Sequence, residues 1–325
     1  MNPNASAIVA VNPHSAYVNV TRVNGVTSVV TMPLGGVISG QAAFINLDGT
    51  SQREMAVVPQ AALVINFPRV TTTSFDALFN PQQGNLTEAI TTRDRQLEQM
   101  RKVLQDAEAY GRAQDAYARD KSLPRPDQNI MLASLVPYVR GERPVIFRAN
   151  REAEIRGAVR FAEELRLKFI IMGGNEAWKI TGFLREKNVP VILTNALDLP
   201  SREDDAYDVN YASAAKLQQA GVRFCISTGS SGQFVRNLPF YAGMSAAFDL
   251  PRAEALKAIT LYPAQIMNLA DRMGSIEVGK MANIVITDGD ILDARTHVRH
   301  LFIAGRRLPL TSRHTELYEQ FKNRR

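Results

Sequence analysis

The stretch EALKAITLYPAQIMNLADRMGSIEVGKMANIVITDGD, Glu254 to Asp290, changes its pattern halfway along. Its first half belongs to an amphipathic helix that we predict from Pro251 to Leu269. After this helix, Gly274 and Gly279 permit tight turns, because glycine tolerates backbone conformations that other residues avoid. The apolar run from Ile284 to Thr287 then predicts a short strand. The stretch therefore predicts a helix that leads into a small β unit.

Strands and helices alternate regularly between Pro144 and this closing stretch. The predicted strands, each followed by a helix, are Val145–Phe147, Lys168–Met172, Val189–Thr194 and Val222–Ser227. Such alternation is typical of a parallel sheet. Each strand ends in small or polar residues, such as Gly173-Gly174-Asn175. In a (β/α) barrel, these carboxyl ends of the strands are where sites are built.

The chain before Pro144 adds further strands and a long helical region. The additional predicted strands are Val26–Thr31, Ala42–Leu47 and Ala61–Phe67. A helix with one apolar stripe is predicted over 91–122, and we expect residues 75–144 to form a helical insertion packed over the barrel, with a lid as one interpretation. The expected domains are a barrel over 1–270, a small β domain over 271–310 and a basic C-terminal helix over 311–325.

The net charge of +6 lies in the C-terminal tail. Residues 294–325 hold eight Lys and Arg against two Asp and Glu, so the rest of the chain, with 30 of each sign, sums to zero. A short basic tail is typical of a solvated helix end, and we therefore expect no nucleic-acid partner. No run of about 18 apolar residues occurs, so no membrane span is predicted.

The cysteine content and the N-terminal sequence further limit the classes of protein to which this chain can belong. Cys225 is the only cysteine, which excludes a disulfide framework and a cysteine-based zinc site. No export signal is visible near Met1. As it stands, the chain is expected to be soluble and cytoplasmic, and exported only if a signal segment precedes it.

Several residues resemble a known family. The closing segment of the amidohydrolase superfamily is matched by Gly274-Ser275, Gly279-Lys280, Ala282, Asp288-Gly289-Asp290 and Gly305-Arg306, with Asn283 where an aspartate is usual. The early strands of the imidazolonepropionase-like branch are similar to Asn12-Pro13-His14, Gly25-Val26-Thr27, Pro33-Leu34-Gly35-Gly36 and Ser39-Gly40-Gln41. The resemblance implies a (β/α)8 TIM-type barrel and a C-terminal β unit that is part of a composite β-sandwich. It also implies that the chain begins after the first barrel strand, so we expect a degenerate, N-terminally truncated member.

The resemblance implies metal-dependent chemistry as well. Superfamily enzymes hydrolyse non-peptide C–N bonds, such as those of cyclic amides, with zinc or another divalent ion that activates a bound water. The positions that resemble the metal ligands here carry Arg148, Asn150, Gly173 and Gly229. A permanent cation opposes metal binding, and a catalytic zinc site needs about three protein ligands. We therefore expect no metal cofactor and weak or absent hydrolysis, without identified catalytic residues.

The four histidines do not restore a metal site. They never form a His-x-His pair and are predicted to be structural: His14, His297, His300 and His314. The segment Gly229-Ser230-Ser231-Gly232 does not have the G-x-S-x-G spacing of a serine hydrolase.

Polar residues at the strand ends are the candidates for substrate binding. They are Arg148, Asn150, Asn175, Glu176, Thr194, Asn195, Thr228, Ser230 and Ser231. In one interpretation they line an anion- or amide-binding pocket in which Arg148 clamps a carboxylate. In the other, Arg148 pairs with Glu176, or with the carboxylates at 203–205, and only replaces the lost metal charge.

Two functions from different classes follow. The first is an amidohydrolase with an unorthodox site. The second is a catalytically inactive barrel that binds a small molecule or pairs with an active homologue. An unpaired barrel edge favours association, so we expect a homo- or hetero-oligomer.

Overall fold

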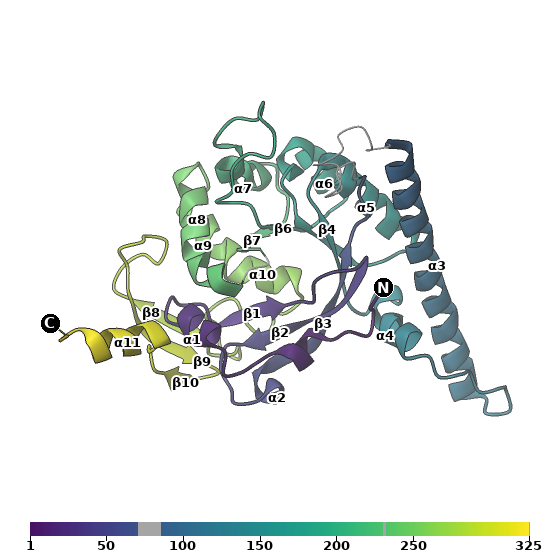
Figure 1. Ribbon diagram of the computed structural model, residues 1–325, viewed down its shortest axis with the longest axis horizontal. Coiled ribbons are helices and arrows are strands. Elements are labelled where there is room, and N and C mark those ends of the chain that lie inside the picture. The colour runs from purple at the N-terminus through teal and green to yellow at the C-terminus, as the bar shows by residue number, and fades with distance from the viewer. Residues whose placement is uncertain (71–85, 230–231, 325) are drawn as a thin grey trace.

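The computed structural model describes residues 1–70, 86–229 and 232–324. Within them, seven strands form one curled sheet and three more form a small antiparallel sheet beside it (Figure 1). The curled sheet has the order β1 (Ser28–Thr31), β2 (Ile38–Asn46), β3 (Ala56–Asn66), β4 (Val145–Ala149), β5 (Phe169–Gly173), β6 (Val191–Leu193) and β7 (Phe224–Ile226). The curl is that of a TIM-type half-barrel, and together with the small C-terminal sheet it confirms the predicted fold class.

The curled sheet changes from antiparallel to parallel pairing at β3. β2 pairs antiparallel with both β1 and β3, whereas β3 to β7 are parallel to one another. Leu63, Val64 and Ile65 in β3 are completely buried, because apolar layers cover both faces of the sheet there. β3 therefore joins the N-terminal hairpins to the regular β/α part of the chain.

Two helices connect β3 to β4. They are α3 (Leu86–Arg119) and α4 (Ile130–Val139), which lie side by side along one flank of the molecule (Figure 1). α3 buries Met100, Leu104 and Ala107 in the cluster that covers the outer face of the sheet, and its Arg101 pairs with Glu164 of α5 (Glu152–Glu164). The described part of the expected insertion is thus helical and packs against the outer helical layer. Residues 75–85 of it lie outside the described residues.

The other helices of the outer layer alternate with the parallel strands. They are the 3-10 helices η3 (Ala177–Ile180) and η4 (Gly232–Asn237), and the helices α6 (Thr181–Glu186), α7 (Val209–Gln219), α8 (Leu238–Ala247) and α9 (Arg252–Ala258). In α5, Ile155, Val159 and Ala162 recur at spacings of three and four and are fully buried with Phe147 of β4. One apolar stripe on each helix is what such an outer layer requires.

The concave face of the sheet is filled by the chain that follows α9. The predicted single helix from Pro251 to Leu269 is wrong, because α9 ends at Ala258 and α10 (Leu261–Ile266) starts afresh. Pro263 explains the break, since proline has no N–H for the carbonyl four residues earlier and its ring crowds that turn. α10 and the residues after it pack in one apolar cluster with Ile146, Ile170 and other concave-side residues.

The small sheet closes the end of the molecule where β3 begins. It consists of β8 (Ile284–Thr287), β9 (Val298–Ile303) and β10 (Arg306–Leu308), and the remaining elements near it are η1 (Ala7–Ala10), α1 (Ala16–Arg22), α2 (Gln52–Met55) and α11 (Arg313–Phe321). Leu301 and Ile303 share an apolar cluster with Ile45 of β2. Asn283 fixes the contact: its Nδ2 donates to Ser28 Oγ (2.9 Å) and to Asn46 Oδ1 (3.0 Å).

None of the helices in the described parts of the chain combines the length and the apolar character that a membrane span requires.

Candidate functional site

The candidate site is a row of side chains at the carboxyl ends of the parallel strands. The register places Asn66, Arg148, Met172, Ile192 and Cys225 next to one another on β3 to β7. Met172, Ile192 and Cys225 belong to the apolar cluster on the concave face, so Arg148 and Asn66 point to the same side. We call these five residues the Arg148 layer. It has a polar half at Asn66 and Arg148 and an apolar half beyond them.

Arg148 is only partly buried as a residue, but two of its donors are covered. Nε and Nη2 are buried and have no hydrogen-bond partner among the residues that the structure describes. Burial lowers the pKa of the Arg148 guanidinium, yet an arginine with so high an ordinary pKa keeps its charge. Within residues 1–70, 86–229 and 232–324, Arg148 forms no ion pair. The interpretation that it pairs with Glu176 or with the carboxylates at 203–205 is therefore wrong.

Glu176 is held by other groups. Its carboxylate is buried and accepts a hydrogen bond from the backbone N–H of Glu152 (2.8 Å), and it pairs with Arg202 (2.8 Å) and Lys179 (3.4 Å). Burial alone would raise the pKa of Glu176, but this hydrogen bond and the two cations outweigh burial and lower that pKa. Lys179 also pairs with Asp205 (3.1 Å). Glu176 thus ties the strand ends to the loop between β6 and α7.

Asn195 has a similar role in the same loop. It is almost completely buried, and its Nδ2 donates to Asn210 Oδ1 (2.7 Å). Asn210 in turn donates to the carbonyl oxygens of Asp198 (3.1 Å) and Leu199 (2.8 Å). Because of these bonds, Asn195 anchors a loop. Its Oδ1 is buried without a partner.

The other candidates have more varied surroundings. The Nδ2 of Asn175 donates to Ser201 Oγ (3.3 Å), at the exposed rim. Thr194 follows β6, and its N–H continues the ladder to the carbonyl of Gly173 (3.4 Å), while Thr228 is buried after β7. Ser230 and Ser231 lie outside the described residues. The structure thus places Arg148 on the concave face and ties Glu176, Asn175 and Asn195 to the rim loop.

The side chain of Asn150 occupies the space that a side chain at position 173 would need. Gly173 has φ of +109°, and a Cβ added to it would lie 2.2 Å from Asn150 Oδ1 and 3.0 Å from the carbonyl oxygen of Ala149. No side chain fits at that position without a shift of the backbone or of Asn150. A histidine ligand is therefore sterically excluded from the place where the family resemblance would put one.

The donor set does not fit a divalent metal ion. Within the described ranges 1–70, 86–229 and 232–324, no three His, Cys, Asp or Glu side chains lie together in a way that could hold a metal ion. Gly229, where the resemblance implies an aspartate, has φ of +81° and no side chain to offer. His297 and His300 lie on or beside the small sheet, where His297 approaches Asp288 and His300 contacts Arg307. The strand ends therefore present a cation and amides in place of metal ligands.

Asn66 is the residue of this layer that the sequence did not single out. Its Nδ2 donates to the carbonyl oxygen of Gly36 (2.6 Å) and to Ser39 Oγ (3.0 Å), which fixes it beside Arg148. The signal was present, because Asn66 interrupts the apolar run ALVINF just before the strand ends. The register between β3 and β4, which places Asn66 beside Arg148, could not be predicted from the sequence.

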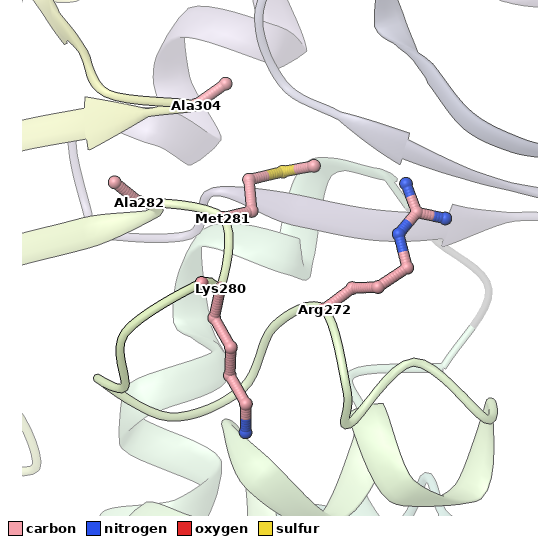
Figure 2. Close-up of a pocket in the computed structure, with 6 residues that line it drawn as sticks. Arg272, Lys280, Met281, Ala282 and Ala304 are labelled. Atoms are coloured by element: carbon pink, nitrogen blue, oxygen red, sulfur yellow. The ribbon is translucent and has the colours of Figure 1, made fainter.

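A separate pocket opens at the other end of the molecule. Its volume is about 380 Å³, and it is lined by Arg272, Gly279, Lys280, Met281, Ala282 and Ala304 (Figure 2). Met281 Sδ accepts a hydrogen bond from Asn46 Nδ2 (3.3 Å), and Asn46 lies at the end of β2 remote from Asn66. Lys280 is already bound to Ser275 (2.6 Å) and Glu277 (3.0 Å). The pocket is therefore distinct from the Arg148 layer.

Comparisons with known proteins identify the family. The model of the amidohydrolase family matches residues 127–309. Imidazolonepropionase of Fusobacterium nucleatum is 36% identical over 84 residues, which are 24% of this chain and 20% of that protein. Imidazolonepropionase of Streptococcus sanguinis is 31% identical over 98 residues, 29% of this chain and 23% of that protein. The match therefore spans about a fifth of the length of these curated relatives.

Among solved structures, an amidohydrolase from Thermotoga maritima MSB8 superposes on 94% of this chain and 78% of its own, with a TM-score of 0.82 and 24% identity. At this level of identity the superposition supports the fold. The family model covers more than half of the sequence. The chain belongs to the amidohydrolase family.

Proposed function

We propose that this chain is a barrel of the amidohydrolase family that binds a small molecule at its strand ends and carries out little or no metal-dependent hydrolysis. The observation that carries the proposal is Arg148, a fixed cation with two buried, unpaired donors at a position that resembles a metal ligand. By family resemblance the reaction class would be hydrolysis of non-peptide C–N bonds, such as those of cyclic amides.

Electrostatics supports the proposal. A divalent cation about 4 Å from a guanidinium would be repelled by about 8 kcal/mol at an effective dielectric constant of about 20. No carboxylate of the described residues offsets this repulsion, since Glu176 is already shared between Arg202 and Lys179. Gly173 adds a steric obstacle, because Asn150 Oδ1 occupies the space of a Cβ there.

Metal analysis of the purified chain tests the proposal. We expect far less than one zinc, nickel or manganese per chain, and no hydrolysis of cyclic amides or dipeptides when these metals are added. About one tightly bound metal ion per chain, or metal-dependent turnover, would contradict it.

A rebuilt ligand pair provides the matched control. Arg148→His with Asn150→His restores two imidazoles two residues apart and removes the cation. We expect this double variant to take up more zinc than the wild type, which shows that the assay detects a weak site. It should still not hydrolyse amides, because two protein ligands fall short of the roughly three of a catalytic zinc site.

The oligomeric state is a separate prediction. The edges of the curled sheet at β1 and β7 favour a homo- or hetero-oligomer. Light scattering of the purified chain checks this, and a monomer at all concentrations would contradict it.

A further inference from the structure

The two unpaired donors of Arg148 lie on one edge of its guanidinium. Nε–H and one N–H of Nη2 point in the same direction, and this edge matches the two oxygens of a carboxylate. Both nitrogens are covered by protein atoms and lack a hydrogen-bond partner. A covered donor without a partner has lost its hydrogen bonds to water without replacing them, and the resulting destabilisation is greater when the group is charged. Such an edge indicates a missing acceptor.

Arg101 shows how the same edge of a guanidinium binds a carboxylate elsewhere in this chain. Its Nε donates to Glu164 Oε1 (2.7 Å) and its Nη2 to Glu164 Oε2 (3.1 Å). This pair lies at the surface, where water is an alternative partner for both groups. Arg148 has the same two atoms in a less solvated place, and no carboxylate of the described residues binds them. The complement that it lacks is therefore a planar group with two acceptor oxygens.

The neighbours of Arg148 cannot supply that group. On one side, the amide nitrogen of Asn66 is bound to Gly36 and Ser39. On the other side, the register places Met172 and then Ile192, both nearly buried and apolar. The layer thus combines one cation with an apolar half and contains no acid.

We propose that Arg148 binds the carboxylate of a small organic acid through Nε and Nη2, with the uncharged body of the acid on the Met172 side of the layer. This inference rests on the proposed function, because it assumes a ligand-binding barrel without a metal ion. The atoms that now cover the donor edge have to move aside. A small, flat acid therefore fits better than a bulky or highly charged one.

Calorimetric titration of the 325-residue chain with three probes tests the inference. Benzoate has the flat carboxylate and an apolar body, benzamide has the same shape without the charge, and inorganic phosphate has charge without the body. We expect benzoate to bind at least about tenfold more tightly than either of the others, since charge-assisted hydrogen bonds contribute about 1.5–3 kcal/mol. Equal binding of benzamide, or tighter binding of phosphate, would overturn the inference.

Variants locate the binding. Arg148→Lys keeps the charge but loses the two-donor edge, and Arg148→Met removes both, so we expect a loss of about tenfold or more in benzoate affinity for the first and undetectable binding for the second. Arg272→Met is the matched control, because it removes an exposed cation that lines the pocket at the opposite end. Benzoate binding that survives in Arg148→Met, or is lost equally in Arg272→Met, would overturn the inference. Circular dichroism of each variant verifies folding.

Metal content measured on the same samples separates the two proposals. Benzoate binding only after metal is added would refute the proposed function. A metal-free chain that binds none of the probes would refute this inference and leave the proposed function standing.

Discussion

The closing segment and the Arg148 layer differ in how they relate to the family. In the closing segment, the family-like residues make structural contacts. Gly274 has φ of +97° and lies against α10, where an added Cβ would be 2.7 Å from that of Ala264, and Lys280 links Ser275 to Glu277. At the strand ends, by contrast, the positions that resemble metal ligands offer no imidazole, thiolate or carboxylate, because they carry Arg148, Asn150, Gly173 and Gly229.

This difference separates the residues that the fold requires for packing from those that metal-dependent hydrolysis requires. The turns and polar contacts of the closing segment hold the small sheet against β2, so their loss would disturb packing. The positions at the strand ends that resemble metal ligands carry other residues here, and the curled sheet forms with them. Family membership therefore predicts the architecture of this chain better than it predicts the residues at its strand ends.

The largest effect is expected for Gly173→Ala. Positive φ and a Cβ 2.2 Å from Asn150 Oδ1 combine backbone strain with a steric clash. We expect a loss of about 4 kcal/mol in the free energy of unfolding, measured by urea titration. Asn150→Gly in the same chain should recover part of it, because the side-chain clash then disappears. A variant as stable as the wild type would show that the strand ends tolerate a side chain where a ligand would stand.

The next comparison sets Gly274→Ala against Gly279→Ala. Both glycines have positive φ, but only Gly274 is crowded, whereas nothing lies within 4 Å of a Cβ at Gly279. We expect a loss of about 3 kcal/mol at Gly274 and about 1 kcal/mol at Gly279, from thermal or urea unfolding. Equal losses would mean that the closing segment needs these glycines only for backbone conformation.

Glu176→Gln tests the rim ion-pair group with a smaller expected effect. The glutamine has the same shape but loses the charge that Arg202 and Lys179 pair with, so we expect about 2 kcal/mol lower stability near neutral pH. The pKa of Glu176 is lowered in the folded chain. Its stabilisation is therefore fully present above the unfolded-state pKa of about 4.3 and is lost as the pH falls through the folded value.

The wild type and this variant should accordingly converge in stability at acidic pH. Glu277→Gln is the control, because its carboxylate pairs with Lys280 but is itself exposed, and ion pairs of exposed carboxylates contribute little to stability. A constant difference between wild type and Glu176→Gln from pH 7 to pH 3 would refute the electrostatic account.

The smallest effect is expected for Arg148→Met without ligand. Methionine fills a similar volume and removes the uncompensated donors, so stability should change little or rise by about 1 kcal/mol. Chemical unfolding without added acid measures it. A loss of several kcal/mol in the free energy of unfolding would assign Arg148 a structural role. It would argue against a role of Arg148 in ligand binding.

The parallel strands could be predicted from the sequence because each is a short apolar run before a polar end. Val145–Ala149 and Phe169–Gly173 are examples. The break between α9 and α10 follows from Pro263 and was available in principle, but the apolar spacing concealed it.

The site was harder to predict. The sequence located Arg148, but its partners depend on register and loop geometry. Glu176 is close in sequence to strand β5 and pairs with Lys179, three residues later, but its second partner Arg202 is brought near only by the folded loop. The neighbour Asn66 lies 82 positions before Arg148 in the chain, and no local pattern specifies that pairing.

The rate at which the Cys225 thiol is alkylated can be used to measure how often the barrel opens. Cys225 has the only thiol, it is nearly buried within the Arg148 layer, and burial raises its pKa to about 12. Because alkylating reagents attack the thiolate, labelling in native buffer proceeds through transiently opened molecules. The labelling rate of unmodified protein therefore reports how often the concave face is exposed, and an acid bound at Arg148 should slow that rate in proportion to its occupancy.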